Sequence, residues 1–283
     1  MIVVKLYGGL GNQLFQYSFA RFLSNEYDAS LLLDISWFKH TTEPRKFELE
    51  NFKVQYTGFY SDKSFFSRIV RRLFNLKLLK ENVFDNSQRD WLPILSAGDN
   101  IILDGYWGSY NKYLFEPSFA TLIRNELCLK NIPKHPLYHR YLDQIKAAAQ
   151  PVSIHIRRGD YVNIPLFELC GRDYYERAIG VIVNSIPNVT YFVFSDEIEW
   201  VKQNFGFLRN ATFVNTGSNI LDFDLMQRCN HNIIANSSFS WWAAYLNHYQ
   251  NKRVILPAKW FSGEKAQAFY ETNIFVPLDW TKV

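Results

Sequence analysis

An apolar run, Pro151-Val152-Ser153-Ile154-His155-Ile156, ends directly in the polar residues Arg157-Arg158-Gly159-Asp160. Short apolar runs bounded by turn residues are typical of buried strands. Four further runs follow it, with stretches of helical spacing between most of them: 190–194, 211–214, 231–235 and 253–256. This alternation predicts parallel strands connected by helices, and so an α/β fold.

The N-terminal half begins in the same way. Residues 1–7 are predicted as a strand, and a glycine turn, a helix over 12–25 and a second strand over 31–34 follow. A new strand is expected to begin at Pro151, after a helix that ends near residue 146. The chain is therefore predicted to form two α/β domains, 1–150 and 151–283, that face each other across a cleft.

Composition restricts the class of protein. Of 283 residues, 48% are hydrophobic and 17% aromatic, which is enough apolar surface for a globular protein. No apolar stretch approaches the roughly 20 residues that span a bilayer. The three cysteines are odd in number and form no CxxC pair, so we expect no disulfide framework. This cysteine usage indicates a protein of the reducing cytoplasm.

The formal net charge of +4 has a local origin. Residues 63–80 contain six basic and no acidic side chains, and apolar residues alternate with them at near-helical spacing. One hypothesis is that this amphipathic helix makes peripheral contact with an anionic membrane. The alternative, which the usual behaviour of such helices favours, is a packed surface helix whose basic side chains face water. No nucleic-acid recognition motif accompanies the basic patch, so nucleic acid is not an expected partner.

Three polar clusters follow predicted strands of the C-terminal half: Arg157 to Asp160, Ser195-Asp196, and Asn236 to Ser240. In an open α/β sheet the carboxyl ends of the strands form the ligand-binding edge. One arginine can donate two parallel hydrogen bonds to a phosphate group, and a helix N-terminus binds anions. Asp196 is suited to accept a hydrogen bond from a ribose hydroxyl or a base N–H. Together the clusters predict a nucleotide diphosphate site.

Each cluster also has a purely structural interpretation. The arginines could simply be solvated, and Ser195-Asp196 and Asn236 to Ser238 could be helix caps. The functional interpretation is favoured because all three clusters are expected at one edge of the sheet.

Two short motifs indicate which cofactors the chain could bind. The turn Gly8-Gly9-Leu10-Gly11-Asn12-Gln13 lacks the spacing of dinucleotide folds and the ending of a P-loop, which disfavours dehydrogenases and kinases. Asp222-Phe223-Asp224 matches the DxD pattern of metal-dependent glycosyltransferases, but its place before an apolar helical run favours helix capping. The histidines show no metal-ligand spacing, so no metal site is predicted.

These motifs carry a resemblance to a known family. The segments 8–17, 155–162, 194–196 and 232–242 resemble, in order and spacing, the α-1,2-fucosyltransferases of glycosyltransferase family 11. The resemblance implies a GT-B-like fold, GDP-fucose as donor, a galactose-terminated acceptor and inversion at the anomeric carbon without a required metal. It also implies a cytoplasmic bacterial enzyme that builds surface polysaccharide.

The resemblance also implies roles for individual residues. Arg157 would hold the β-phosphate and stabilise the departing GDP, and Asn12 would lie near the reacting bond. The nucleotide-binding set that it implies is Gly9, Gly11, Gln13, His155, Arg158, Ser195, Asp196, Asn236, Ser237, Ser238, Phe239 and Ser240. Asp160 is the first candidate for the catalytic base, with Glu168 and Asp173 as competitors. It could instead orient Arg157, and the phosphate of the donor could accept the proton.

The sequence departs from the family pattern at two places. Gly108 stands where a glutamine commonly follows the glycine, tyrosine and aromatic residue, and Phe167-Glu168-Leu169-Cys170 lacks the usual His-Gly pair before the cysteine. The identity of the acceptor is therefore less certain than that of the donor. Two other functions remain open: another nucleotide-sugar transferase or hydrolase, and a carbohydrate-binding module without catalysis. The paired arginines disfavour the last, because a neutral glycan has no diphosphate to bind.

Overall fold

The computed structural model describes residues 1–60, 82–85, 100–132, 134–167, 169–208, 210–273, 276–277 and 279–283. The chain forms two compact units, Met1–Lys130 and Asn131–Val283. The division precedes the predicted boundary at residue 150, because helix α5 (Pro136–Ala147) packs against helix α8 (Asn219–Arg228) of the second unit. The Tyr138 hydroxyl of α5 donates to Oδ2 of Asp224 in α8 over 2.6 Å. The predicted basic helix over 63–80 lies outside the described residues.

In the first unit the described strands form one parallel sheet in the order β3-β2-β1-β5-β4. Their bounds are Ile2–Lys5 for β1, Leu31–Asp34 for β2, Gly58–Phe59 for β3, Asn82–Asp85 for β4 and Ile101–Asp104 for β5. The helices are α1 (Leu10–Glu26), α2 (Trp37–His40), α4 (Pro117–Glu126) and the 3₁₀ segments η1 (Leu49–Asn51) and η3 (Gly108–Phe115). The predicted strands at 1–7 and 31–34 and the helix at 12–25 are confirmed to within a few residues.

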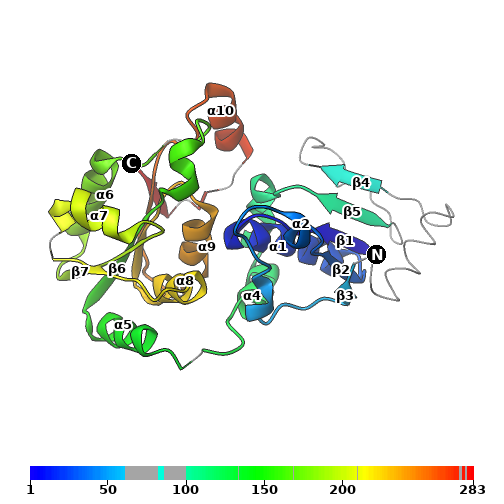
Figure 1. The fold of residues 1–283 in the computed structure, drawn as a ribbon, viewed down its shortest axis with the longest axis horizontal. Helices are drawn as coiled ribbons and strands as arrows, with labels where there is room; N and C mark the ends of the chain where they lie inside the picture. The colour runs from blue at the N-terminus through cyan, green and yellow to red at the C-terminus, as the bar shows by residue number, and fades with distance from the viewer. Residues whose placement is uncertain are drawn as a thin grey trace. The chain divides into compact units, whose positions relative to one another are not determined.

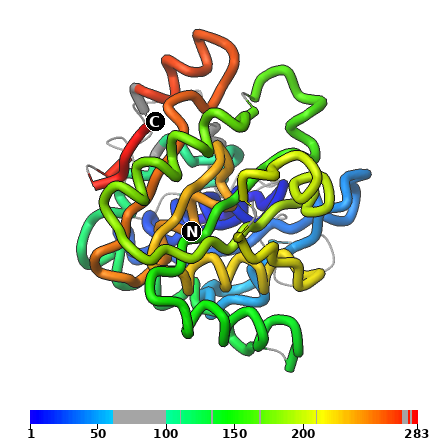
Figure 2. Tube along the Cα trace, turned by 90° about the vertical axis from the view of Figure 1, so that its left-hand side faces the viewer, coloured from blue at the N-terminus to red at the C-terminus, as the bar shows by residue number. Residues whose placement is uncertain are grey.

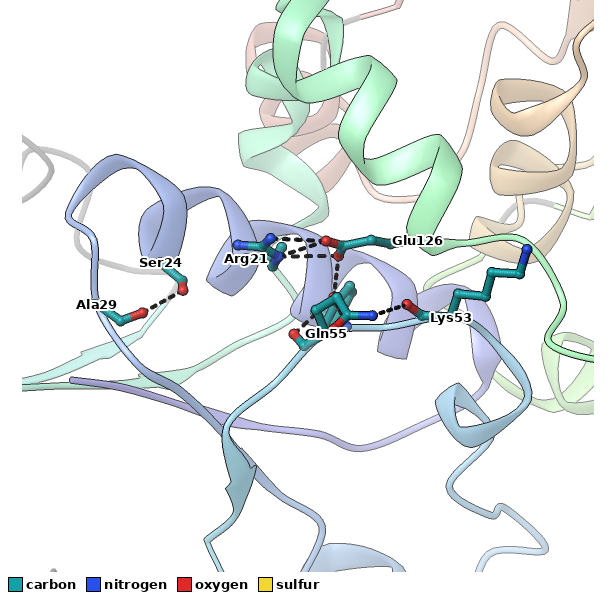
Figure 3. Close-up of polar contacts among 7 residues, drawn as sticks. Arg21, Ser24, Ala29, Lys53, Gln55 and Glu126 are labelled. Carbon is teal, nitrogen blue, oxygen red and sulfur yellow. Dashed lines mark hydrogen bonds and ion pairs between the residues drawn. The ribbon is translucent and has the colours of Figure 1, made fainter.

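Helix α1 is the buried helix of this unit. A polar cluster joins it to α4: the Tyr17 hydroxyl and the Arg21 guanidinium both donate to the Glu126 carboxylate, with Arg21 Nη2 3.0 Å from Oε1 (Figure 3). The backbone N–H of Gln55 donates to the Tyr17 hydroxyl over 2.8 Å. A buried carboxylate is costly unless it is paired, so these bonds fix where α4 packs.

The second unit is the part of the chain coloured from green to red in Figure 2. Its described strands form a parallel sheet in the order β11-β10-β9-β6-β7-β8. Their bounds are Gln150–Ile156 for β6, Val189–Ser195 for β7, Thr212–Phe213 for β8, His231–Ile233 for β9, Val254–Leu256 for β10 and Trp280–Lys282 for β11. The five strands predicted here are confirmed, and β11 was not predicted.

Helices cover both faces of this sheet (Figure 1). They are α6 (Arg172–Ser185), α7 (Ile198–Asn204), α8, α9 (Ser238–Leu246) and α10 (Glu264–Asn273), with the 3₁₀ segments η4 (Gly159–Asn163) and η5 (Gly206–Leu208). Alternate residues of β6 divide between the faces. Val152, Ile154 and Ile156 pack into the core with α6 and α7, so Ser153 and His155 point to the opposite face, on which α8 and α9 lie.

Candidate active site

Strands β6 and β7 are adjacent and parallel, so their carboxyl ends lie at the same edge of the sheet. Arg157 follows β6 and Asp196 follows β7. The two side chains meet there, with Nη1 of Arg157 2.8 Å from Oδ2 of Asp196. Nη2 of Arg157 pairs with Oδ1 of Asp160, three residues further along the chain. Two carboxylates therefore fix the orientation of one guanidinium, whose side chain is 17% exposed.

Gly159 makes this pairing sterically feasible. Its φ is +26°, a conformation that L side chains rarely adopt, and a Cβ built there would lie 2.5 Å from Oδ2 of Asp196. Any side chain at this position would press on the carboxylate that orients Arg157. The glycine between the arginines and Asp160 is thus required by the geometry of the edge.

Arg158 has different partners from Arg157. Its Nε donates to Oε2 of Glu197 over 2.9 Å, and its guanidinium carbon lies 3.2 Å from the ring centroid of Trp200. Its backbone N–H donates to Oδ1 of Asp196 over 3.1 Å. The structure thus separates the two arginines, with Arg158 held against α7 and Arg157 at the strand-end carboxylates. The sequence placed both in the nucleotide pocket, because it does not reveal the direction of side chains beyond a strand.

The turn after β7 places Asp196. The hydroxyl of Ser195 accepts a hydrogen bond from the backbone N–H of Glu197 over 3.0 Å, which forms a local turn around Asp196. Both carboxylate oxygens of Asp196 have partners in Arg157 and Arg158. In this structure Asp196 orients the arginine, whereas the sequence suggested a ribose or base contact.

His155 is buried at the end of β6. Burial, and secondarily the positive charge of Arg157, lowers the pKa of His155 to about 3, so its imidazole is neutral. Its ring lies 5.5 Å from that of Phe239, and its Nδ1 has no hydrogen-bond partner among the described residues. Unsatisfied buried polar atoms are uncommon in native proteins, and a ligand is one explanation for them.

Asn236 to Ser240 lead into the N-terminus of α9. The amide of Asn236 donates to the carbonyl of Trp260 over 2.8 Å, and the buried hydroxyl of Ser240 donates to the carbonyl of Ser237 over 3.3 Å. Ser237, the N-cap residue, makes no side-chain capping bond, and the first turn of α9 contains no acidic residue. Ser238 and Phe239 begin the helix. The side chains of Asn236 and Ser240 thus stabilise the turn, and its capacity for anions comes from the helix end.

The glycine turn of the first unit begins with Gly8, whose φ is +74°. Gly9 is the N-cap of α1, and the guanidinium of Arg45 lies above it, 3.4 Å from where a Cβ would stand. Gln13 is fully buried: its Nε2 donates to the carbonyls of Gly8 and Lys46, and its Oε1 accepts from the backbone N–H of Glu48. Gln13 therefore holds the turn together.

The rest of this turn lies around Asn12 and Gly11. The side chain of Asn12 is half-buried, and its Nδ2 would lie 2.9 Å from a Cβ at Gly8. Gly11 is buried in the first turn of α1. The backbone N–H of Asn12 donates to the carbonyl of Gly9 over 3.0 Å. The predicted contacts of Gly11 and Asn12 with the donor stay predictions.

The DxD motif has both its carboxylates engaged within the second unit. Oδ1 of Asp222 accepts from the Thr216 hydroxyl over 2.7 Å, and burial raises the pKa of Asp222 to about 6. Asp224 accepts from Tyr138 and from Arg228. Among the residues that the structure describes, no group of three or more His, Cys, Asp or Glu side chains could hold a metal ion. Asp222 is an acidic residue in the first turn of α8, whose N-cap is Ser218, whereas Asp224 lies further into the helix, so the capping interpretation fits only Asp222.

Known proteins resemble the whole chain. A family model described as glycosyl transferase family 11 matches residues 141–281. The chain is 32% identical to the alpha-1,2-colitosyltransferase of Escherichia coli, over 95% of this chain and 95% of that protein. The chain belongs to glycosyltransferase family 11. It is therefore a glycosyltransferase.

Further relatives and a solved structure show how far the likeness extends. The O-antigen biosynthesis glycosyltransferase WbnK of Escherichia coli is 32% identical, over 91% of this chain and 94% of its own. The galactoside alpha-(1,2)-fucosyltransferase 2 of Rattus norvegicus is 33% identical, over 34% of this chain and 29% of its own. The fucosyltransferase NodZ from Bradyrhizobium has a TM-score of 0.54 at 15% identity, over 86% of this chain and 91% of that one. With two parallel α/β units, this family 11 chain has a GT-B-like fold, as predicted.

Two regions in which the sequence departs from the family 11 pattern have a structural account. Phe167 stacks on Tyr161 at 3.9 Å between ring centroids and lies 5.7 Å from Phe261, so this loop is held by aromatic packing. Gly108 lies against the ring of Phe15, with 3.5 Å to a Cβ built there. Of the alternative bases, Asp173 is exposed in the first turn of α6, and Glu168 lies outside the described residues.

Sequence reasoning missed several residues of the site. Tyr161, whose ring lies 5.1 Å from the Arg157 guanidinium carbon, and the pair Glu197 and Trp200 that holds Arg158 were not predicted as partners. Arg157 and Tyr161 lie four residues apart. That spacing would have predicted their contact only if the turn after β6 were known to be helical. Trp200 could have been found from its spacing to Glu197 on one helical turn.

Proposed function

We propose that this protein is an inverting α-1,2-fucosyltransferase, which transfers L-fucose from GDP-fucose to the 2-hydroxyl of a terminal galactose. The observation that carries the proposal is the Arg157 guanidinium, fixed by Asp160 and Asp196 at the ligand-binding edge of the second unit. A guanidinium held in this way can form paired hydrogen bonds to a diphosphate without rearrangement. The names of the relatives support transfer of a 6-deoxy sugar in α-1,2 linkage.

The donor contacts belong to the second unit in this proposal. Arg157 binds the β-phosphate, the N-terminus of α9 faces the phosphates, and neutral His155 offers Nδ1 to the nucleotide. The turn at Asn12 contributes from the first unit, on which the acceptor binds. The roles of Arg158, Gln13, Ser195 and Asp196 in this proposal are to position neighbouring groups, because their described bonds are internal.

In the reaction the acceptor hydroxyl attacks the anomeric carbon as the bond to the β-phosphate oxygen breaks, and the hydroxyl proton passes to Asp160 or to the departing phosphate. Negative charge gathers on the departing GDP, and Arg157 stabilises that charge. No bound metal enters this scheme, in which the guanidinium and the backbone N–H groups at the N-terminus of α9 donate to the departing diphosphate. Removing one donor that stabilises such a charge typically costs roughly 10²–10³ in rate.

The decisive experiment is product analysis. Purified protein, freed of metal with EDTA, is given GDP-fucose with and without a galactoside, and the linkage of the product is determined. Arg157→Ala is expected to lose at least roughly 10²-fold in kcat with its fold intact. A folded Arg157→Ala variant with near-normal turnover would contradict the proposal, and release of free fucose irrespective of acceptor would identify a hydrolase.

The most specific rival donor is GDP-colitose, because the relative from Escherichia coli is named for colitose. Colitose is L-fucose without its 3-hydroxyl, so the two donors differ by one hydroxyl group. Parallel measurements of kcat/KM with both donors separate the functions. Binding of GDP in calorimetry also separates either enzyme from a carbohydrate-binding module, which has no use for a diphosphate.

We propose that Asp160 positions Arg157 and that the departing phosphate, not Asp160, accepts the proton, since Oδ1 of Asp160 pairs with the guanidinium. Asp160→Asn should lower kcat and keep the acidic limb of the pH–rate profile. Loss of that limb would instead make Asp160 the base.

WbnK is named for O-antigen biosynthesis, which supports a surface polysaccharide as the class of acceptor. We further propose a cytoplasmic enzyme, for which peripheral membrane contact through residues 63–80 is the alternative to a basic segment that only faces water. None of the helices in the described ranges has the length and apolar composition needed to cross a bilayer. Sedimentation with anionic vesicles at low salt tests the contact, and absence of binding there would refute it.

A further inference from the structure

The first unit contains a cavity of about 470 Å³ at the carboxyl edge of its own sheet. Strands β1, β2 and β5 end beside it and contribute one pair of lining residues each: Lys5 and Tyr7, Asp34 and Trp37, Asp104 and Tyr106. The volume falls within the range of small-ligand sites, and the place is the one at which open α/β sheets bind ligands.

Aromatic rings form one wall of this cavity. Tyr7 packs edge-on against Tyr106, with 5.0 Å between ring centroids, and lies 6.3 Å from Trp37. Tyr106 is half exposed, at 50% of its surface. An exposed ring beside a cavity offers an apolar face and a polar tip to a ligand.

The backbone after Tyr106 accounts for this exposure. Trp107 has a φ of +57°, in the left-handed region that bulky residues rarely occupy. Its side chain is fully buried and stacks on Phe19 at 4.8 Å between ring centroids. The left-handed residue anchors the chain in the core while the preceding Tyr106 stays at the cavity. Conformations of this kind persist where the surroundings enforce them, and they cluster at functional sites.

The polar groups of the cavity suit a ligand that carries hydroxyl groups. Lys5 donates to Oδ2 of Asp104 over 2.7 Å, and the Tyr7 hydroxyl is hydrogen-bonded to Asp104 as well. Burial, followed by the charge of Asp104, raises the pKa of Tyr7. Oδ1 of Asp34 accepts from the backbone N–H of Ser36 over 2.9 Å. One ammonium against two carboxylates leaves the cavity rich in hydrogen-bond acceptors for the hydroxyl groups of a ligand.

We propose that this cavity binds the terminal neutral hexose of the acceptor, with the ring of Tyr106 stacked on the sugar and the carboxylates of Asp34 and Asp104 accepting from its hydroxyls. The inference rests on the proposed function, because that function supplies a galactoside as the neutral substrate. It assigns acceptor binding to a site within the first unit, whereas the arginine cluster belongs to the second.

The test uses the full-length protein labelled with ¹⁵N and titrated with methyl β-D-galactoside. The indole signal of Trp37 is expected to shift on saturation. Tyr106→Ala is expected to weaken binding roughly tenfold and to raise the acceptor KM by a similar factor, the upper end of what an aromatic contact contributes. Tyr106→Phe keeps the ring and should stay close to the parent in both measurements, and binding of GDP should be unchanged in both variants.

A matched control is Tyr249→Ala, which removes a tyrosine of the second unit that is 37% exposed, and it should leave the acceptor KM unchanged. Parental galactoside affinity in Tyr106→Ala would overturn the proposal, as would saturation without a shift of the Trp37 signal. These results differ from failure of the proposed function, which would appear as absence of transfer from GDP-fucose in the parent protein.

Discussion

Replacing His155 by glutamine is expected to reduce the loss of stability that the second unit suffers in mild acid. The pKa of His155 falls from 6.5 to about 3 through burial and the charge of Arg157. The unfolded chain therefore binds a proton on this residue below about pH 6.5, whereas the folded chain does not. Stability is fully present above that value and is lost as pH falls toward 3.

The magnitude follows from the size of the shift. Each pH unit between the two pKa values is equivalent to about 1.4 kcal/mol, so lowering the pH from about 7.5 to about 5 should cost about 2 kcal/mol through this residue. Glutamine does not titrate and should remove that share of the loss. Its constant effect on packing is separated by comparing the slopes with pH, not the absolute values.

Hydrogen exchange of peptides that contain β6, measured in urea at each pH and corrected for intrinsic exchange rates, reports the unfolding free energy of the second unit. His139→Gln serves as the control, because His139 is exposed in α5 and its removal should leave the slope unchanged. Equal slopes for the parent and His155→Gln would refute the assignment of a buried neutral imidazole.

Three further predictions concern particular contacts. Gly159→Ala should displace Asp196 and lower kcat at least about tenfold. Gly217→Ala is the control, because Gly217 is also at positive φ but has open space around it; this variant should lose only roughly 1 kcal/mol of unfolding free energy and keep its kcat. Equal losses of kcat in the two variants would contradict the prediction. Glu126→Gln should destabilise the first unit by roughly 2 kcal/mol in urea unfolding, because Arg21 loses its charged partner, and parental stability would show that the pair contributes nothing. Burial raises the pKa of Asp222 to about 6, so the folded protein gains stability as the pH falls from 6 toward 3.8 and this residue takes up a proton. Asp222→Asn should therefore be more stable than the parent near pH 7.5, by up to roughly 3 kcal/mol. Near pH 4 the difference in unfolding free energy should disappear.

The alternation of apolar and helical segments was enough to predict the second sheet. Strands β6, β9 and β10 are buried almost throughout, so the sequence displays each as part of a short apolar run. The strand-end rule then brought Arg157 and Asp196 to one edge, and the structure places them 2.8 Å apart. Strand β11 was missed, because its alternate residues are exposed and Trp280 alone is buried.

The directions of side chains beyond the strands could not be predicted. Arg157 and Arg158 are neighbours in sequence, yet one pairs with strand-end carboxylates and the other stacks on Trp200. Gln13 was predicted to bind the ligand, but its side chain is engaged by three hydrogen bonds to backbone groups of Gly8, Lys46 and Glu48. The cavity of the first unit was missed because its lining comes from three separate segments, and the left-handed turn at Trp107 has no signature in a tryptophan.

The pairing of Arg157 with two carboxylates also bears on how the enzyme would turn over. One positive charge among two negative charges gives this cluster a formal charge of −1, so a diphosphate that binds there meets a precisely directed donor but little net attraction. Such a site stabilises the transition state, in which the leaving oxygen is most negative, more than it stabilises bound GDP. A bare arginine would hold GDP more tightly and delay the next cycle, so the two aspartates are expected to speed release of the product.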